Sequence, residues 1–193
     1  MNRPDEHLIE HPLDTETRLE GDWLHVLRDR VRLPDGREAT REYVRHPGAV
    51  AVVPILDDGR LVLVRQYRYP VQAVLLELPA GKRDPNEAML TCAARELREE
   101  TGYVAREWAR AGGFHNAAAY STETIEIWFA RGLEPGPQQL DDGEFIETVT
   151  LSVAELDALC AAGQVPDMKT MIGLQWLQRW QAGGWPLAWI AAA

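Results

Sequence analysis

The segment from Gly81 to Tyr103, GKRDPNEAMLTCAARELREETGY, restricts the possible fold of this chain more than any other segment. Asp84, Pro85 and Glu87 match a helix start: an acidic N-cap, proline at the first helical position and glutamate three residues after the cap. Gly102 matches the glycine that commonly follows a helix. The segment therefore predicts one helix between Asp84 and Gly102.

This helix would carry two different faces. At about 100° per residue, one stripe collects mostly apolar residues, Leu90, Ala93, Ala94, Leu97 and Thr101. Glu96, Glu99 and Glu100 share another face, where like charges at spacings of three and four repel by a few tenths of a kcal/mol. Clustered carboxylates are the hard oxygen ligands that Mg²⁺ or Mn²⁺ takes. A solvated charged surface is the other interpretation of these three glutamates alone.

The spacing of the whole segment decides between the two interpretations. It reads glycine, five residues, glutamate, seven residues and then RELREETGY, which resembles the complete signature of the Nudix hydrolases. The fixed positions are filled by Gly81, Glu87, Arg95, Glu96, Glu99, Glu100 and Gly102. With average residue usage, these identities would coincide by chance on the order of once in 10⁸ to 10⁹ starting positions. The resemblance therefore favours a metal site.

The family resemblance implies a role for each acidic position. The expected metal ligands are Glu96, Glu99, Glu100 and the carbonyl of Ala80, which precedes a tight turn at Gly81. Glu99 and Arg95 are also expected among the catalytic residues, with Arg95 orienting the ligand carboxylates from outside the metal shell and Glu87 steadying the helix. Nudix enzymes cleave a diphosphate joined to another group, with Mg²⁺, or Mn²⁺ in its place, as cofactor.

Composition and charge exclude several classes of protein. The 193 residues are 46% hydrophobic and 26% charged, as in a soluble globular protein, and the formal net charge of −10 argues against a nucleic-acid partner. Cys92 and Cys160 are lone thiols, expected to be reduced. The first residues lack a hydrophobic signal core and no apolar run reaches membrane-spanning length. We expect a cytoplasmic protein with no membrane partner.

The chain before the signature segment predicts two blocks of β-structure. Residues 1 to about 16 are polar and aperiodic, as in a loose arm. Strand-like runs at 17–33 and 37–44 flank a Pro-Asp-Gly turn and predict a small antiparallel sheet. The apolar runs Gly48–Leu56 and Leu61–Arg65, joined by Asp-Asp-Gly, predict a β-hairpin.

The remaining elements complete an α/β fold. Further strands are expected at Val74–Leu78, Ile125–Ala130 and Phe145–Leu151, and helices at 152–161, capped by Ser152 with Glu155, and from Asp167 to about Trp180. Together they predict a mixed sheet in an α/β/α sandwich, which is the Nudix fold that the resemblance implies. We expect an N-terminal sheet segment at 1–46, a hydrolase domain at 47–182 and a tail at 183–193.

Three stretches outside the signature resemble the ADP-ribose pyrophosphatase branch of the family. They are REYVRHPGAVAVVPI with VRQYRYP and ELPAG, then YSTETIEIWFA, and then DDGEFIE through AGQVPDMKT to IGLQWLQ. By this resemblance Arg68, and less specifically Arg41, would bind a substrate phosphate, and Glu123 would lie near the ribose end. Glu144 is the preferred general base or additional ligand, with Asp142 and Glu147 as alternates.

One segment departs from this branch. A Ser-Pro-Gly turn usually precedes the glutamate at the position of Glu123, whereas this chain has His115 followed by Asn116–Ala119 and no proline. The departure concerns specificity for the terminal ribose, because this turn lies against the substrate in the branch. His115 could supply a replacement contact, although a lone histidine is more often structural.

These features predict a Mg²⁺-dependent hydrolase that converts ADP-ribose to AMP and ribose 5-phosphate. Another nucleoside diphosphate sugar, such as GDP-mannose, is the alternative substrate, and a nucleotide-sensing module without catalysis is the alternative class. A sensor has no need for three mutually repelling carboxylates. The resemblance also implies a homodimer that pairs through the N-terminal sheet, with Trp23 stacking on the base of the substrate.

Overall fold

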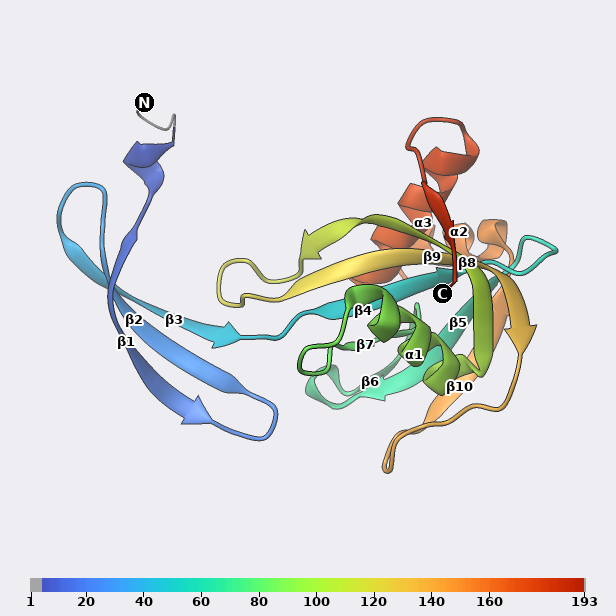
Figure 1. Cartoon of the computed structure of the whole chain (residues 1–193), viewed down its shortest axis with the longest axis horizontal. Coiled ribbons are helices and arrows are strands. Elements are labelled where there is room, and N and C mark those ends of the chain that lie inside the picture. Colours follow the sequence, from blue (N-terminus) through green and yellow to red (C-terminus); the bar gives the residue numbers. More distant parts are fainter. Residues whose placement is uncertain (1–4, 193) are drawn as a thin grey trace. The chain divides into compact units, whose positions relative to one another are not determined.

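The computed structural model describes residues 5–192 and divides them into two compact units (Figure 1). The first unit contains the chain up to Pro47 together with His115–Thr124. The second unit contains Gly48–Phe114 and the chain from Ile125 onwards. Each unit is described separately.

The first unit is built on a three-stranded antiparallel sheet, in the order β1-β2-β3. A 3₁₀ turn, η1 (Glu6–Leu8), precedes β1 (His11–Glu20), β2 (His25–Arg32) and β3 (Glu38–Arg45). The small N-terminal antiparallel sheet is thus confirmed. It buries Leu27 and Val31, which share one face of β2 because they are four residues apart.

The loose arm expected through residue 16 is wrong from His11 onwards, and its first four residues lie outside the described part of the chain. β1 pairs with β2 from His11↔Arg32 to Glu20↔His25. Every residue of β1 is exposed, so its sequence lacks the alternation of apolar and polar residues that identifies a half-buried strand. Polar contacts accompany the pairing instead, including Arg30 Nε to Asp14 Oδ2 at 2.9 Å.

The second unit contains two sheets. Five strands pair in the order β11-β8-β9-β4-β7: β4 (Ala49–Pro54), β7 (Ala80–Lys82), β8 (Tyr103–His115), β9 (Thr124–Pro135) and β11 (Trp189–Ala191). Three strands pair antiparallel in the order β10-β5-β6: β5 (Leu61–Arg68), β6 (Ala73–Glu77) and β10 (Ile146–Leu151), with η2 (Tyr69–Val71) between β5 and β6. β4 runs parallel to β9 and antiparallel to β7, so the larger sheet is mixed.

The predicted hairpin at 48–65 is wrong beyond its turn. Leu56 N–H donates to Arg60 O at 2.8 Å and Ile55 bridges Leu61, but β4 and β5 then enter different sheets. All of β4 and residues 61–64 of β5 are buried. Strands buried on both faces read as continuous apolar runs, which do not reveal which partner each strand takes.

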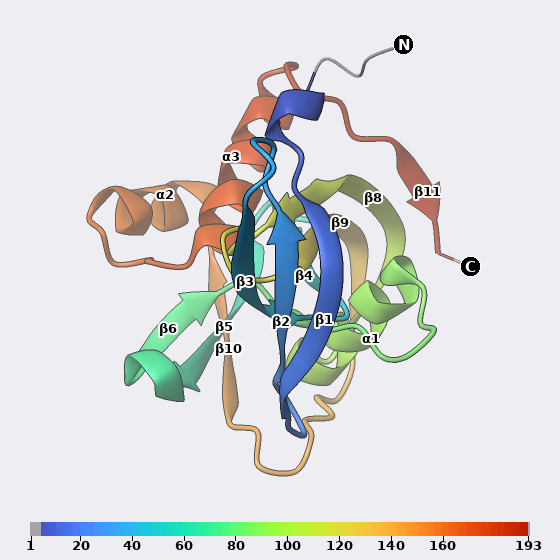
Figure 2. The same cartoon turned by 90° about the vertical axis from the view of Figure 1, so that its left-hand side faces the viewer.

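The residues of β4 alternate between two core layers. Val50 and Val52 pack in the cluster with helix α1 (Met89–Thr101), whereas Ala51 and Val53 pack in the cluster with α2 (Val153–Ala161) and α3 (Met168–Gln181). Figures 1 and 2 show α1 on one face of the sheet and α3 on the other. Each fully buried valine contributes about 1.5–3 kcal/mol. The α/β/α sandwich is therefore confirmed.

Helix α1 begins later than predicted. Its N-cap is Ala88 rather than Asp84, and Asn86 has a left-handed φ of 64° that interrupts helical geometry. One of the two hydrogen bonds of a capping box is present, since the Asp84 N–H donates to Glu87 Oε2 at 3.0 Å, but the residues between them are not helical. Glu87 uses the same carboxylate to bind Arg95, which holds residues 84–88 in a loop. Gly102 ends the helix as predicted, with φ 76°.

The two later helices follow the predicted boundaries. Ser152 and Glu155 form the expected capping box of α2, and Asp167 caps α3 by accepting from Thr170 N–H. Beyond α3, β11 pairs with β8, and Trp189 packs near Trp180 with its ring 4.0 Å from the Arg131 guanidinium.

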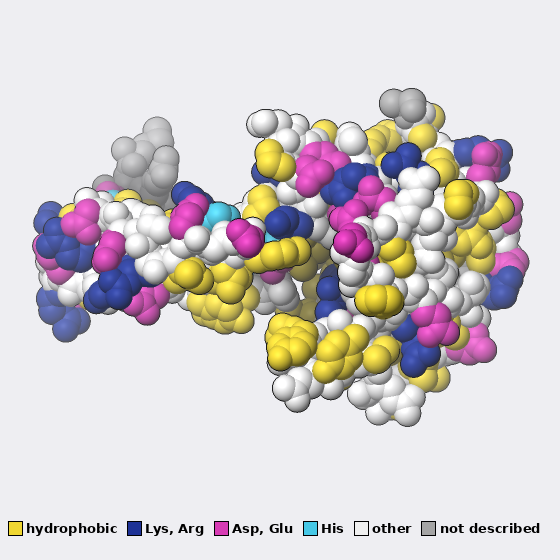
Figure 3. Space-filling view, turned by 90° about the horizontal axis from the view of Figure 1, so that it is seen from below, with side chains coloured by type: hydrophobic (Ala, Val, Ile, Leu, Met, Phe, Trp, Pro, Cys, Tyr) yellow, Lys and Arg dark blue, Asp and Glu magenta, His cyan; other side chains and the backbone are white. Residues whose placement is uncertain are grey.

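Hydrophobic side chains also reach the surface of both units (Figure 3). In the first unit, the exposed large ones include Leu19, Trp23 and Leu24. In the second, Tyr67, Tyr69, Val71 and Val74 are exposed along β5, η2 and β6. Across residues 5–192, every helix is too short or too polar to span a lipid bilayer.

Candidate active site

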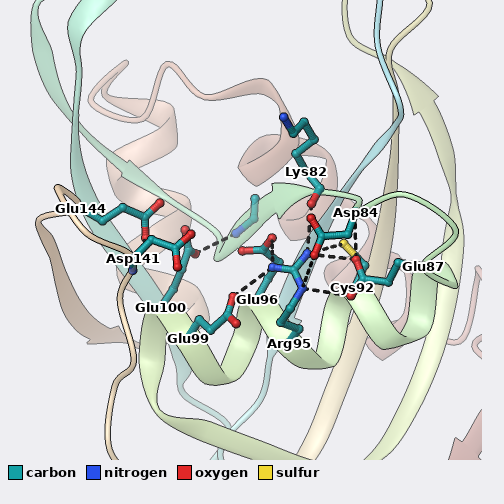
Figure 4. Close-up of polar contacts among 11 residues, drawn as sticks. Lys82, Asp84, Glu87, Cys92, Arg95, Glu96, Glu99, Glu100, Asp141 and Glu144 are labelled. Atoms are coloured by element: carbon teal, nitrogen blue, oxygen red, sulfur yellow. Dashed lines mark hydrogen bonds and ion pairs between the residues drawn. The ribbon is translucent and has the colours of Figure 1, made fainter. Parts of the chain in front are cut away.

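The glutamates of α1 lie beside β7. Glu96 is 8% exposed and Glu100 4%, whereas Glu99 is half-buried. The Ala80 N–H donates to Glu100 Oε2 at 2.9 Å, which joins the helix to the strand (Figure 4). The predicted role of the Ala80 carbonyl as a metal ligand stays a prediction.

Gly81 lies in strand β7 and not in the tight turn that we expected. Its N–H and C=O groups belong to the ladder with β4, where it pairs with Val50. A Cβ atom at this position would lie 2.0 Å from the carboxylate carbon of Glu96. Glycine is required here because the Glu96 carboxylate occupies the space of a side chain, and no special backbone angle is involved.

Arg95 is the centre of the polar contacts on this face. It donates to Glu87 through Nε and Nη2 at 2.9 and 3.0 Å, and its Nη1 donates to Glu96 Oε1 at 2.7 Å and Glu99 Oε2 at 3.0 Å. Its Nη2 also donates to the Lys82 carbonyl of β7 at 3.1 Å. Figure 4 shows the guanidinium between these carboxylates. The contacts match the orienting role expected for Arg95, which stays a proposal.

The protonation of the acids differs across the site. The hydrogen bond from Arg95 lowers the pKa of Glu87 to about 2, so Glu87 is an anion at neutral pH. Burial raises the pKa of Glu96 to about 7 and that of Glu100 to about 8, although Arg95 opposes the shift at Glu96 and the Ala80 N–H opposes it at Glu100. At both residues the cost of burying a carboxylate outweighs the stabilisation that these donors give to its ionised form.

These residues fit a divalent cation in their chemistry. Two desolvated carboxylates and a half-buried third offer hard oxygen ligands beside the space left by Gly81. Within residues 5–192 no three His, Cys, Asp or Glu side chains already stand in a metal-binding arrangement. In their present positions Glu96 and Glu99 both accept from Arg95, and Glu100 accepts from the Ala80 N–H.

A loop opposite α1 brings a further carboxylate to the site. Figure 4 shows Asp141 and Glu144 beside Glu100, and the negative charge of Glu144 contributes to the raised pKa values of Glu96 and Glu100. Asp142 is exposed in the same loop. Glu147, the other alternate, accepts from Arg65 at 2.8 Å on β5. Proximity therefore supports Glu144 over the two alternates as the loop carboxylate.

The loop is fastened to the C-terminal end of α1. Gln138 donates its side-chain amide to the Glu100 carbonyl, and Gln139 N–H donates to the Glu99 carbonyl at 3.0 Å. Gly102 allows this approach, since a Cβ there would lie 2.2 Å from the Gly136 carbonyl oxygen. The loop that carries Glu144 is therefore bonded directly to the backbone of Glu99 and Glu100.

Arg68 lies near the same acids but its contacts were not predicted. It donates through Nε and Nη2 to Glu77 at 2.9 and 2.8 Å, and Glu77 also binds Lys169. Glu77 and Lys169 lie in the ELPAG and PDMKT stretches, but neither of the two residues was given a role. A charged residue at the buried end of a strand is the signal that could have identified Glu77.

The other predicted substrate residues belong to the first unit. Arg41 is exposed and pairs with Glu10, with its Nε 2.9 Å from Glu10 Oε2. Trp23 is 70% exposed in the bend between β1 and β2. Glu123 accepts from Asn116 Nδ2 at 3.0 Å and lies 3.7 Å from His46 Nε2. Their roles in substrate binding stay predictions.

The segment that departs from the expected Ser-Pro-Gly turn has its own contacts within the first unit. His115 Nδ1 lies 3.2 Å from the Glu123 carbonyl oxygen and 3.4 Å from Thr124 Oγ1. Thr122 Oγ1 accepts from the His46 N–H at 2.9 Å. Asn116, in the same segment, donates to the carboxylate of Glu123 and holds that side chain in place.

Comparisons with known proteins agree with the fold and with its division into an N-terminal sheet and a larger domain. Residues 45–172 match the NUDIX domain, and residues 10–44 match the nucleoside diphosphate sugar hydrolase N-terminal domain. An ADP-ribose pyrophosphatase of Bacillus subtilis is 33% identical over 89% of this chain and 94% of its own length. An ADP-sugar pyrophosphatase of Mus musculus is 32% identical over 82% of this chain and 81% of its own. A crystal structure of an ADP compounds hydrolase superposes with a TM-score of 0.81 at 26% identity, covering 90% and 95% of the two chains.

Proposed function

Because this chain belongs to the Nudix hydrolase family, we propose that it is a Mg²⁺-dependent pyrophosphatase that hydrolyses ADP-ribose to AMP and ribose 5-phosphate. The observation that carries the proposal is the grouping of Glu96, Glu99 and Glu100 beside Ala80 and Gly81, with Glu144 facing them (Figure 4). Several relatives are named for the hydrolysis of compounds that contain ADP, which supports an ADP-containing substrate for this chain.

Different residues would bind the metal ion, orient its ligands and bind the substrate phosphate. Glu96, Glu99 and Glu100, with the Ala80 carbonyl, would hold Mg²⁺ or Mn²⁺. The ion supplies charge neutralisation for the diphosphate and a lowered pKa for water. Arg95 would orient the carboxylates of Glu96 and Glu99, to which it donates through Nη1, and balance their charge. Arg68 supplies a cation for a phosphate oxygen.

The reaction needs one water and one base. The water oxygen bonds to phosphorus as the bridging P–O bond breaks, and the other half of the diphosphate leaves with the bridging oxygen as a phosphate monoester, so that the two products are AMP and ribose 5-phosphate. Glu144 accepts the water proton, because it is the loop carboxylate that faces the α1 acids. Asp142 is the alternate base.

A substrate panel tests the proposal. Purified protein with Mg²⁺ is assayed on ADP-ribose, GDP-mannose and the common deoxynucleoside triphosphates, with phosphatase added to release phosphate from the products. We expect the largest kcat/KM on ADP-ribose. Preference for GDP-mannose would overturn the substrate but retain the pyrophosphatase, and preference for a triphosphate would overturn the branch. Binding of ADP-ribose without turnover would identify the sensing module instead.

The proposal extends to assembly and location. We propose a cytoplasmic homodimer that pairs through the N-terminal sheet, because Leu19, Trp23 and Leu24 leave apolar surface exposed on that unit. Residues 1–46 would then be the pairing segment, 47–182 the hydrolase domain and 183–193 a tail. Trp23 would stack on the base of the substrate, and Arg41 and Glu123 would contact it.

A further inference from the structure

Glu77 is a buried acid held between two cations. It lies at the end of β6 and is 1% exposed. Arg68 of β5 donates two parallel hydrogen bonds to its two carboxylate oxygens, and the ammonium of Lys169 on α3 contacts Oε2. Burial alone would raise the pKa of Glu77, but the two cations lower it below its ordinary range. Glu77 is therefore an anion whose charge is matched from both sides.

The bidentate contact fixes the plane of the Arg68 guanidinium. Nε and Nη2 are committed to Glu77, whereas an arginine has five N–H donors in a rigid fork. The remaining donors must face away from Glu77. The charge of Arg68 partly opposes the rise in the pKa of Glu100 that burial causes, so the guanidinium lies close to the acidic site. An arginine fixed in this way is ready for a phosphate oxygen.

Lys169 reaches Glu77 because the start of α3 is fastened to the strand that leads into the site. Lys169 Nζ also contacts Asp167 Oδ1 at 2.9 Å, and Asp167 Oδ2 accepts from the Thr170 N–H at 3.0 Å. Thr170 is fully buried, and its hydroxyl accepts from the Leu78 N–H at 2.8 Å. The lysine is therefore held in place from its own helix and from the residue next to Glu77.

We infer that Glu77 and Lys169 are positioning residues that hold the Arg68 guanidinium toward a phosphate of the bound substrate. The inference rests on the proposed function, since it deepens the role of Arg68 at that site. Lys169 keeps Glu77 ionised and holds its Oε2 atom in place by direct contact. The fixed carboxylate of Glu77 in turn aligns the Arg68 guanidinium. The competing explanation is that Lys169 only balances the charge of a buried acid.

A double-mutant cycle separates the two explanations. KM and kcat are measured for Lys169→Met, Glu77→Gln and the double variant, beside Arg68→Met. We expect Lys169→Met and Glu77→Gln each to raise KM by about 5- to 10-fold with a smaller change in kcat, as for a weakened charge-assisted contact. The double variant should keep the raised KM within twofold of Glu77→Gln, because Arg68 has lost its anchor. Lys169→Arg should restore most of the affinity.

Charge balancing alone predicts the opposite for the double variant. Glu77 and Lys169 then no longer leave each other unpaired, and the part-exposed Arg68 keeps its charge in contact with solvent, so KM would return to the wild-type value and overturn the inference. An unchanged KM in Lys169→Met would overturn it as well. If Lys169→Met alone does not fold, the KM of the double variant still decides between the two explanations. Arg60→Met, which breaks an exposed ion pair with Asp58, is the matched control and should leave KM unchanged.

The experiment also distinguishes this inference from the proposed function. The cycle is run on whichever nucleoside diphosphate sugar the wild type cleaves best, so a substrate other than ADP-ribose overturns only the proposed function. Dissociation constants for ADP-ribose, measured by calorimetry on the same proteins, give a second readout that needs no turnover. Wild-type protein that neither cleaves nor binds any of these sugars overturns both.

Discussion

Glu100 combines almost complete burial with a charge that only a partner can stabilise. It is 4% exposed, and burial raises its pKa to about 8. We predict that Glu100→Gln, which keeps the shape and removes the charge, lowers kcat/KM roughly 10²- to 10⁴-fold, since a lost metal ligand costs several kcal/mol of transition-state stabilisation. Steady-state kinetics at saturating Mg²⁺ measure the loss. Glu134→Gln, at an exposed position, is the control.

Normal turnover by a folded Glu100→Gln protein would contradict the metal-ligand assignment. Thermal unfolding should show that this variant is at least as stable as the wild type without metal, because a neutral amide suits a buried position better than a carboxylate. Activity and stability would then change in opposite directions.

The Glu87–Arg95 pair gives a pH-dependent prediction with a definite sign. Arg95 lowers the folded-state pKa of Glu87 to about 2, below its ordinary 4.5. The contribution of this pair to the free energy of unfolding is therefore fully present above about pH 5 and is lost as pH falls toward 2. We predict that Glu87→Gln destabilises the protein at pH 7 and by roughly half as much or less at pH 3.

Urea unfolding of wild type and variant at several pH values tests this linkage. A Glu16→Gln variant is a suitable control, because Glu16 forms an exposed pair with Arg18 and should show little effect at either pH. An equal destabilisation by Glu87→Gln at pH 3 and pH 7 would show that the lost contribution is packing and not charge.

Single residues also show what sequence spacing can and cannot reveal. The positions of Glu87, Arg95 and Glu96 could be predicted, because they lie within one helix and its approach loop. The contact between Glu77 and Lys169 could not, since the two residues are 92 positions apart and meet only through the fold. Gly81 was identified as necessary, but for the wrong reason, because a sequence does not show which side chain occupies the place of a missing Cβ.

At the scale of elements, β7 and α1 fit together only with glycine between them. We predict that Gly81→Ala lowers the free energy of unfolding by about 1–3 kcal/mol, the usual cost of overpacking, because its Cβ would displace the Glu96 carboxylate. Activity should fall further than stability explains. Chemical unfolding and kinetics on the same preparation measure both. Gly112→Ala is the control, since its Cβ would meet the Phe114 ring at 3.4 Å.

The loop that carries Glu144 gives a second prediction at this scale. Gln138→Ala removes the side-chain donor to the Glu100 carbonyl. We predict a fall in kcat of about 3- to 10-fold with little change in KM, the scale of one lost hydrogen bond. Hydrogen exchange of the loop amides should become faster. Gln178→Ala, which removes a donor to Asp157 between α3 and α2, should change neither quantity.

The elements that sequence predicted best are those with local signals. The capping residues Ser152 and Asp167 located α2 and α3, because a cap is made by neighbours in the chain. The strands missed in whole or in part were β1, β7, β8 and β11, and the two long ones, β1 and β8, were missed for different physical reasons. β1 is exposed throughout and so has no apolar alternation, and β8 mixes buried Trp108 and Ala109 with charged and small residues. The partner of β5 depends on tertiary packing, which a turn signal does not contain.

For the whole molecule, the exposed apolar surface of the first unit predicts self-association. We expect sedimentation at micromolar concentration to give a species of twice the 21.7 kDa chain mass. A sheet of three strands is only marginally stable alone and needs a surface to pack on, which in the dimer would be the partner subunit. Deleting residues 1–44 would remove this contact and should give a monomer with weaker substrate binding.

Two outcomes would contradict this prediction. A monomeric full-length protein at micromolar concentration would exclude the dimer. A dimer that persists after the deletion would place the interface elsewhere, and Tyr69→Ser on the exposed surface of the second unit would then be the next variant to examine. Trp23→Ala in the dimer separates pairing from substrate stacking, since only a stacking role raises KM without dissociation.

The short ladder between β4 and β7 makes catalysis a check on correct strand pairing. Its register pairs Ala49 with Lys82, Val50 with Gly81 and Ala51 with Ala80, and one backbone hydrogen bond continues it at each end. Sliding β7 by one residue would bring Ala80 or Lys82 opposite Val50 and set a side chain against the Glu96 carboxylate. It would also remove the Ala80 N–H from Glu100. A molecule that folded with this slip would lose activity together with stability, so activity reports the fidelity of folding.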